Sequence, residues 1–209
     1  MSAAADSRAL AGSFTHHQKP ALSRLLFFRG PPGVTLLPMS APNIFLIGPM
    51  GSGKSAVGKR LARELGCEFV DSDELIEIRT GVDIPYIFEK EGESGFRKRE
   101  CEVIEELSQG AGLVLATGGG AVLSKAVRLA LAARGQVVYL QTSVQQQLRR
   151  TRGSKRPLLN KGRRRQVLEE LMLIREPLYQ ELADLVVATD GRTVASVAAE
   201  IREKLADDR

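Results

Sequence analysis

The feature that most constrains this chain is residues 48–55, Gly-Pro-Met-Gly-Ser-Gly-Lys-Ser, which fit the pattern G-x-x-x-x-G-K-[ST] in full. Residues 43–47 before it form a short apolar run with β-branched and aromatic side chains, typical of a strand buried on both faces. After it, Val57, Leu61 and Leu65 recur at four-residue spacing, which indicates an amphipathic helix. A strand, a glycine loop and a helix in this order predict a phosphate-binding loop.

The residue types of this loop suit that chemistry. Its glycines let backbone N–H groups approach a phosphate at a helix N-terminus, where the helix dipole favours negative charge. Lys54 would reach the β- and γ-phosphates of a nucleotide, and the Ser55 hydroxyl would take a Mg²⁺ position. The predicted nucleotide contacts in the loop and the first helical turn are Gly51, Ser52, Gly53, Lys54, Ser55 and Ala56. A glycine-rich turn with an unrelated lysine is the alternative, which the strand-to-helix context disfavours.

Length and charge limit the number of domains and the kinds of ligand this chain can have. A chain of 209 residues with ordinary globular composition predicts one well-buried domain. Residues 1–38 contribute +3 of the formal net charge of +5, so the remainder is nearly balanced. That balance favours anionic small molecules over nucleic acid as ligands. No apolar run approaches the roughly 20 residues of a membrane helix, so we expect no membrane partner.

The two cysteines, Cys67 and Cys101, have no metal-ligand spacing and suit a reducing compartment, so we expect a cytoplasmic protein. Residues 1–38 are rich in Ala, Ser, Gly and Pro, and Met39 stands just before the first strand. We expect this segment to be a disordered extension or the product of an upstream start codon. A transit peptide is the functional alternative, because the segment is basic, poor in acid and carries a short apolar patch. The folded domain is expected over residues 39–209.

Acidic residues follow the second predicted strand, residues 68–70. The carboxyl ends of parallel strands face the crevice where ligands bind, so Asp71 and Asp73 are candidate site residues. One carboxylate would face Mg²⁺ and the other an acceptor substrate. In the alternative interpretation, Asp73 only caps the helix over residues 74–80.

Further candidates come later in the chain. Arg97 and Glu100 stand three apart on one predicted helix face, where the pair is either a surface ion pair or part of a substrate clamp. Gly118, Gly119 and Gly120 follow a buried strand over residues 113–116 and permit close backbone approach by a ligand.

Residues 151–165 are polar and basic, with no acidic residue. They predict a mobile lid over a triphosphate, or else a solvated loop or a nucleic-acid patch; the absence of aromatics and the nearby phosphate loop favour the lid. Strands alternating with helices throughout predict an α/β sandwich around a parallel sheet with right-handed crossovers. No sustained heptad repeat is present, and we expect a monomer.

With these pieces in place, the chain from about Asn43 to Leu205 resembles the shikimate kinases, a family of small phosphate-loop kinases. The resemblance rests on the order and spacing of the phosphate loop, residues 71–73, Gly92-Glu93 with Phe96-Arg97, residues 118–120, residues 156–159 and residues 175–179. It implies a three-layer α/β/α sandwich with a five-stranded parallel sheet in the order 2-3-1-4-5, of the P-loop NTPase type. It also implies that ATP, with Mg²⁺, phosphorylates the 3-hydroxyl of shikimate.

The resemblance also implies roles for residues. Asp73 would bind the acceptor hydroxyls, Asp71 would act near Mg²⁺ through water, and Arg150 would lie against the adenine. Arg156 would be the lid arginine over the γ-phosphate, which completes a catalytic set with Lys54 and Asp73. The shikimate carboxylate would lie in a pocket lined by Arg97, Gly118, Gly119, Gly120 and Arg175.

One departure from the family pattern is Gly95, which stands beside Phe96 where an acidic residue is common. The strand before Gly118 also lacks a Walker-B aspartate, as expected in a family in which Asp71 serves instead. Three alternatives stay open on sequence alone: another small-molecule kinase of this fold, such as a gluconate or nucleoside-monophosphate kinase; a non-catalytic ATP-binding homologue; and a nucleic-acid-binding module.

Overall fold

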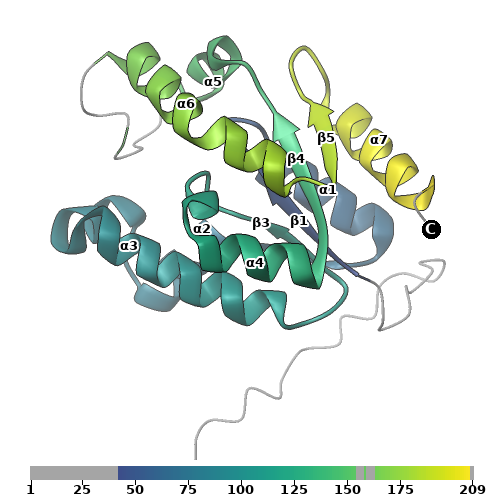
Figure 1. Ribbon diagram of the computed structural model, residues 1–209, viewed down its shortest axis with the longest axis horizontal. Helices are drawn as coiled ribbons and strands as arrows, with labels where there is room; N and C mark the ends of the chain where they lie inside the picture. Colours follow the sequence, from purple (N-terminus) through teal and green to yellow (C-terminus); the bar gives the residue numbers. More distant parts are fainter. Residues whose placement is uncertain (1–41, 154–157, 159–162, 208–209) are drawn as a thin grey trace, which may run out of the picture. The chain divides into compact units, whose positions relative to one another are not determined.

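The computed structural model describes residues 42–153, 158 and 163–207, all of which belong to one compact unit. Five strands form a single sheet in the order β2-β3-β1-β4-β5 (Figure 1), and every neighbouring pair is parallel. This confirms the predicted sheet. The strands are β1 Asn43–Ile47, β2 Glu68–Asp71, β3 Leu113–Ala116, β4 Gly135–Gln141 and β5 Leu185–Ala188.

The central strand β1 fixes the register. Ile44 lies opposite Val114 of β3 and Gln136 of β4, so β1 is hydrogen-bonded on both edges. All five of its residues are buried, as the apolar run predicted. The phosphate loop follows β1 directly and therefore lies at the carboxyl end of the sheet, beside the ends of β3 and β4.

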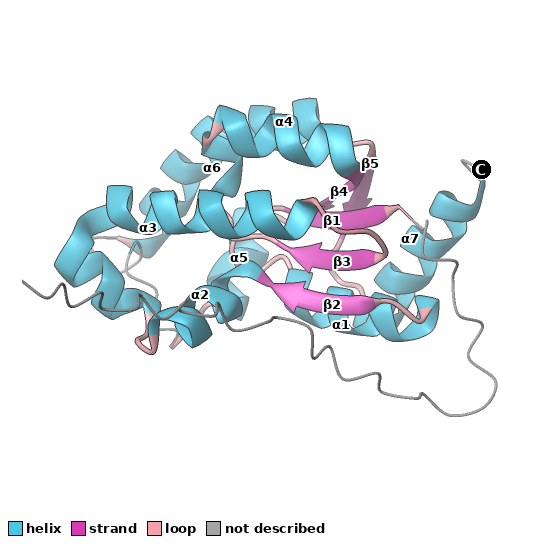
Figure 2. Cartoon of the chain, turned by 90° about the horizontal axis from the view of Figure 1, so that it is seen from below, coloured by secondary structure: helices cyan, strands magenta, loops and turns pink. Residues whose placement is uncertain are grey.

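The helices cover both faces of the sheet. Alternate residues of β1 point to opposite sides: Leu46 packs with side chains of α1 and α7, and Phe45 with those of α3, α4 and α6. Figure 2 shows α3 and α4 on one side of the sheet and α1 and α7 on the other. The helices are α1 Lys54–Leu65, α2 Ser72–Thr80, α3 Ile84–Ser108, α4 Lys125–Arg134, α5 Val144–Arg150, α6 Arg164–Leu182 and α7 Val194–Asp207, with a 3₁₀ turn over Ala121–Leu123.

Two helices differ from the prediction. The sequence predicts two helices here, a short one that Pro85 opens and a second one that follows residues 92–100. In the structure they run together as α3, with a break in helical geometry only at Gly92. Val167, Leu168, Leu171, Ile174 and Leu178 predict the apolar face of a helix that is disturbed at Pro177. In the structure α6 continues through Pro177, and Ile174 is 61% exposed, so its placement on the apolar face was wrong. No described helix is both long enough and apolar enough to cross a lipid bilayer.

Candidate active site

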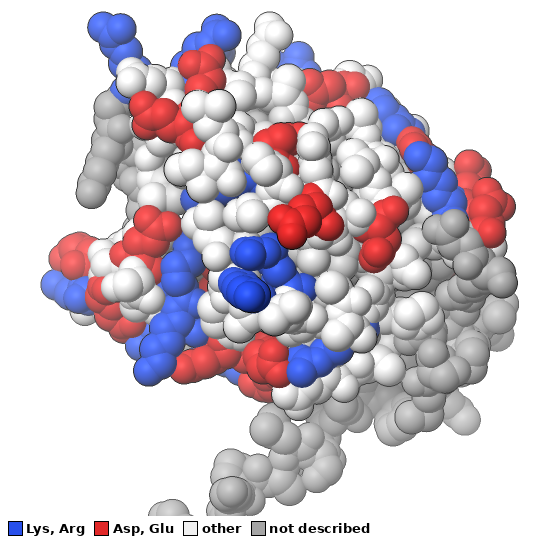
Figure 3. Space-filling model, viewed as in Figure 1, with Lys and Arg blue, Asp and Glu red and all other residues white. Residues whose placement is uncertain are grey.

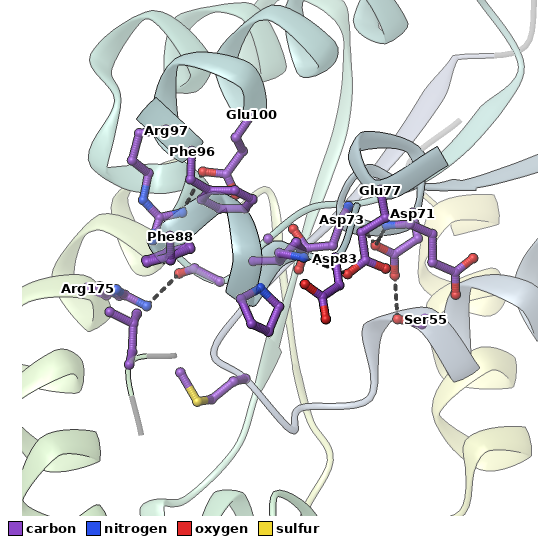
Figure 4. A pocket seen from close by; sticks show the side chains of 18 residues that line it. Ser55, Asp71, Asp73, Glu77, Asp83, Phe88, Phe96, Arg97, Glu100 and Arg175 are labelled. Atoms are coloured by element: carbon purple, nitrogen blue, oxygen red, sulfur yellow. Dashed lines mark hydrogen bonds and ion pairs between the residues drawn. The ribbon is translucent and has the colours of Figure 1, made fainter. Parts of the chain in front are cut away.

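A cavity of about 470 Å³ opens at the carboxyl end of the sheet (Figure 4). Its walls come from the phosphate loop and α1, the β2–α2 junction, both halves of α3, the glycine run after β3, and α6. Two arginines face several carboxylates across it, with apolar side chains between them. The lining residues are Met50, Ser55, Asp71, Asp73, Glu74, Glu77, Asp83, Ile84, Pro85, Phe88, Phe96, Arg97, Glu100, Gly118, Gly119, Gly120, Leu158 and Arg175.

The phosphate loop is held by its own lysine. The Lys54 ammonium donates to the carbonyls of Gly48, at 2.8 Å, and Pro49, at 2.9 Å. Lys54 is only 9% exposed, because the loop wraps around it. Gly53 is the N-cap of α1 and provides no side-chain cap, which leaves the first N–H groups of that helix available to an anion.

Ser55 and Asp71 come together as the sequence predicted. The Ser55 hydroxyl donates to Oδ2 of Asp71 at 2.5 Å. The other carboxylate oxygen, Oδ1, accepts from the N–H groups of Asp73 and Glu74 and so caps α2. The alternative in which Asp73 caps the helix was therefore wrong: the cap is Asp71, and α2 begins at Ser72.

A hydroxyl and a carboxylate oxygen are ligands that Mg²⁺ accepts, so this pair fits the ion. Within the described part of the chain, no group of three or more His, Cys, Asp or Glu side chains could hold a metal. That donor set suits an ion held by one or two protein ligands together with substrate phosphates and waters.

Arg97 and Glu100 form a pair at the cavity wall, partly buried through Glu100, and not a surface pair. Nη1 of Arg97 donates to Oε2 of Glu100 at 2.6 Å, and Glu100 is fully buried. Burial raises the pKa of Glu100, against the opposing attraction of Arg97. Burial by itself would lower the pKa of Arg97, but the charge and hydrogen bonds of Glu100 and Glu93 raise it overall. The guanidinium is thus fixed on the cavity wall in its charged form.

Arg175 reaches the same cavity from α6. It is 4% exposed; its Nη1 donates a long hydrogen bond of 3.3 Å to the Gly119 carbonyl, and its guanidinium also interacts with the Tyr179 hydroxyl. Its Nε is buried without a hydrogen-bond partner, and no described carboxylate forms an ion pair with it. Burial lowers the pKa of this guanidinium.

The glycine run is required by crowding. A Cβ at Gly118 would overlap Oε1 of Glu100 and come within 2.8 Å of Oδ1 of Asp73. A Cβ at Gly120 would overlap the guanidinium of Arg97. Glu100, Asp73 and Arg97 therefore approach this backbone more closely than a residue with a Cβ would allow.

The remaining predicted residues lie elsewhere. The Arg150 guanidinium donates to the carbonyls of Gly51, at 3.0 Å, and Thr189, at 3.0 Å, so it joins the phosphate loop to the segment after β5, outside the cavity. Ala56 is exposed in the first turn of α1. Arg156 and most of the predicted lid lie outside the described residues.

Sequence reasoning missed part of the lining. Helical spacing places Phe88 on an apolar helix face, and Phe96 entered only as part of the family motif with Arg97, yet the two rings lie against each other on the cavity wall with centroids 5.0 Å apart. Glu100 was considered only as the ion-pair partner of Arg97. Helical periodicity marks such positions as inward-facing, but it does not distinguish core from cavity.

A phosphate loop, a serine–aspartate pair for a divalent cation, and arginines facing a carboxylate in a neighbouring cavity define a P-loop kinase of small anionic molecules. The family model described as shikimate kinase matches residues 50–206. The chain belongs to the shikimate kinase family, whose members are ATP-dependent kinases.

Individual relatives agree. The shikimate kinase of Shewanella oneidensis is 56% identical over 164 residues, covering 78% of this chain and 96% of that protein. The enzyme of Francisella tularensis subsp. holarctica is 54% identical over 168 residues, covering 79% and 96%. The structure of shikimate kinase from Acinetobacter baumannii in complex with shikimate superposes with a TM-score of 0.80 at 48% identity, covering 82% of this chain and 96% of that one.

Proposed function

We propose that this chain transfers the γ-phosphoryl group of MgATP to the 3-hydroxyl of shikimate, giving shikimate 3-phosphate and ADP. The observation that carries the proposal is Arg175: a buried guanidinium without a carboxylate partner among the described residues, in a cavity beside a phosphate loop. A buried charge is costly unless it is paired, so the site is built to receive an anion. A similar protein binds shikimate, which carries a carboxylate.

The cavity has the groups that this acceptor needs. Arg97 and Arg175 present guanidinium groups, whose planar donors match a carboxylate. Among the described residues, no acceptor is found for the backbone N–H groups of Gly119 and Gly120, so these are available to the same carboxylate. Phe88 and Phe96 supply an apolar wall for the ring.

Asp73 lies on the opposite side, where it would orient the reacting hydroxyl and take its proton. Lys54 would turn from the loop carbonyls to the β- and γ-phosphates. Bound Mg²⁺ would neutralise charge on the phosphates, held by Ser55 and, through water, by Asp71. Arg150 would border the adenine, and Arg156 would cover the γ-phosphate from the lid.

The surface suits a small-molecule enzyme better than a nucleic-acid binder. Figure 3 shows basic and acidic side chains interspersed over the face in view, not gathered into one basic field. Cys67 and Cys101 are free thiols, in line with a reducing compartment such as the cytoplasm. We propose that the enzyme acts there as a monomer.

The test is ADP release by the purified protein with MgATP, in the presence and absence of shikimate, with gluconate and AMP as control acceptors. We expect turnover that depends on shikimate and is abolished in Lys54→Ala, because the transferred phosphoryl group then lacks its fixed cation. Turnover with gluconate or AMP instead would reassign the acceptor. ATP binding without turnover on any acceptor would favour a non-catalytic homologue.

A further inference from the structure

The carbonyl of Gly119 is held from α6 by two side chains one helical turn apart. The Tyr179 hydroxyl donates a short hydrogen bond to it, and Nη1 of Arg175 donates a long one, at 3.3 Å. Tyr179 is completely buried, and it is not among the residues that line the cavity. It therefore acts on the site through the two groups it contacts, the Gly119 carbonyl and the Arg175 side chain.

The direction of the Gly119 carbonyl decides where the N–H of Gly120 points. In a trans peptide the C=O of one residue and the N–H of the next point in opposite directions from a rigid plane. With the Gly119 carbonyl turned to Tyr179, the N–H of Gly120 faces away from α6. Gly119 and Gly120 have no side chains that would limit rotation of the peptide plane between them. The Tyr179 hydroxyl supplies that restraint instead.

The same carbonyl competes for Arg175. Without the Tyr179 hydroxyl, its remaining side-chain donor in the described structure would be the Arg175 guanidinium. A buried carbonyl that has lost a donor draws the next one closer, because an unsatisfied buried acceptor is costly. Arg175 would then turn toward the backbone and away from a bound anion.

We propose that Tyr179 is a positioning residue for the acceptor carboxylate: its hydroxyl fixes the Gly119 carbonyl, and thereby sets the Gly120 N–H and leaves Arg175 free to bind. This inference rests on the proposed function. It assigns to the hydroxyl an effect on acceptor binding and none on nucleotide affinity, since its hydrogen bond goes to the Gly119 carbonyl and none of the described hydrogen bonds joins Tyr179 to the phosphate loop.

The position of Tyr179 is itself fixed. Its ring stacks on that of Tyr139, with centroids 5.0 Å apart and planes at 21°. The Tyr139 hydroxyl donates to Oε2 of Glu176 at 2.5 Å and has no described hydrogen bond to the glycine run. Burial raises the pKa of the Tyr179 hydroxyl above its ordinary value, so it stays protonated and donating throughout a kinetic pH range.

The pair of stacked tyrosines provides a matched experiment. Tyr179→Phe and Tyr139→Phe each remove one buried hydroxyl and keep the stacked rings. We expect Tyr179→Phe to raise KM for shikimate about three- to tenfold, the range set by the net worth of one hydrogen bond, with KM for ATP unchanged. Both variants lose one buried hydrogen bond, so their melting temperatures should fall by similar amounts. Tyr139→Phe should leave KM for shikimate at the wild-type value.

Calorimetric titration of shikimate into both variants at low temperature gives the same comparison without relying on turnover. Equal shikimate affinity in the two variants, or a parallel rise in KM for ATP and shikimate in Tyr179→Phe, would overturn the positioning role and leave a structural one. The wild-type protein in the same assay separates the two proposals. If it turns over shikimate while Tyr179→Phe behaves like Tyr139→Phe, only the positioning role fails; if it does not use shikimate, both fail.

Discussion

Glu100 shows how a single residue is used at the expense of stability. Its carboxylate is fully buried, one oxygen is bonded to Arg97, and the other has no hydrogen-bond partner in the described structure. Desolvation outweighs the attraction of Arg97, and the pKa is raised. The ionised form that orients Arg97 is therefore the form that folding disfavours.

This gives a pH-dependent prediction. An unfolded glutamate titrates near pKa ~4.3. Because the folded pKa of Glu100 is higher, its contribution to stability is complete below about pH 4.3 and is lost as the pH rises through the folded value. Glu100→Gln lacks this loss, so its melting temperature relative to wild type should rise with pH across that window, while KM for shikimate increases because Arg97 is less firmly oriented.

Thermal unfolding of wild type and Glu100→Gln at a series of pH values checks this. The control is Glu93→Gln, which removes the other acidic partner of Arg97 at a side chain 45% exposed; a surface pair of this kind contributes about 0–1 kcal/mol. A difference in melting temperature that stays flat with pH, or falls, would show that Arg97 compensates the buried charge in full.

At the scale of elements, the kink in α3 shapes the acceptor cavity. Gly92 has φ 69° and ψ −176°, and a Cβ there would meet nothing within 4 Å. The first half of the helix contributes Phe88 to the cavity, and the second half contributes Phe96 and Arg97. The backbone conformation of one residue therefore sets the angle between two walls of the site.

Substitution by asparagine at Gly92 and at Gly81 distinguishes the effect of backbone strain from that of crowding. Gly81, the C-cap of α2, has φ 70° and ψ 10°, a left-handed conformation that asparagine tolerates. The conformation of Gly92 belongs to a region that is essentially confined to glycine, at a cost of about 1–3 kcal/mol for other residues. We expect Gly92→Asn to lose about 1–3 kcal/mol of stability and to raise KM for shikimate but not for ATP. Gly81→Asn should lose less stability than Gly92→Asn, because asparagine tolerates the left-handed conformation.

Urea denaturation and steady-state kinetics of the two asparagine variants give both readouts. Since neither position has a neighbour within 4 Å of the added Cβ, a difference between them reports backbone conformation. Equal destabilisation of the two, or unchanged shikimate kinetics in Gly92→Asn, would mean that the helix adjusts at Gly92 without moving the cavity walls.

At the scale of the whole molecule, the sequence predicted the architecture well, and for identifiable reasons. Fully buried strands such as residues 113–116 read as continuous apolar runs, and the phosphate loop fixes what surrounds it. The strand order came from the family resemblance, because periodicity alone does not order strands. The sequence could not show that Glu100 is completely buried or that Ile174 is exposed, because a 3.6-residue repeat marks a face without saying what covers it.

The boundary between residues 38 and 39 remains a prediction, and it can be tested on the whole chain. The described core clusters and the acceptor cavity are built from residue 43 onward. The matches to the curated relatives cover 96% of those proteins but at most 79% of this chain. A version that begins at Met39 should therefore have the kcat and both KM values of the full chain.

Its melting temperature should also agree within about 2 °C, which corresponds to less than ~1 kcal/mol for a domain of this size. The truncation lowers the net charge from +5 to +2, because residues 1–38 hold four basic residues and one acidic residue. Comparing both forms at low and high salt separates this electrostatic change from loss of specific contacts, since screening weakens only the former. A lower melting temperature or a higher KM that persists at high salt would place part of the first 38 residues in the folded enzyme.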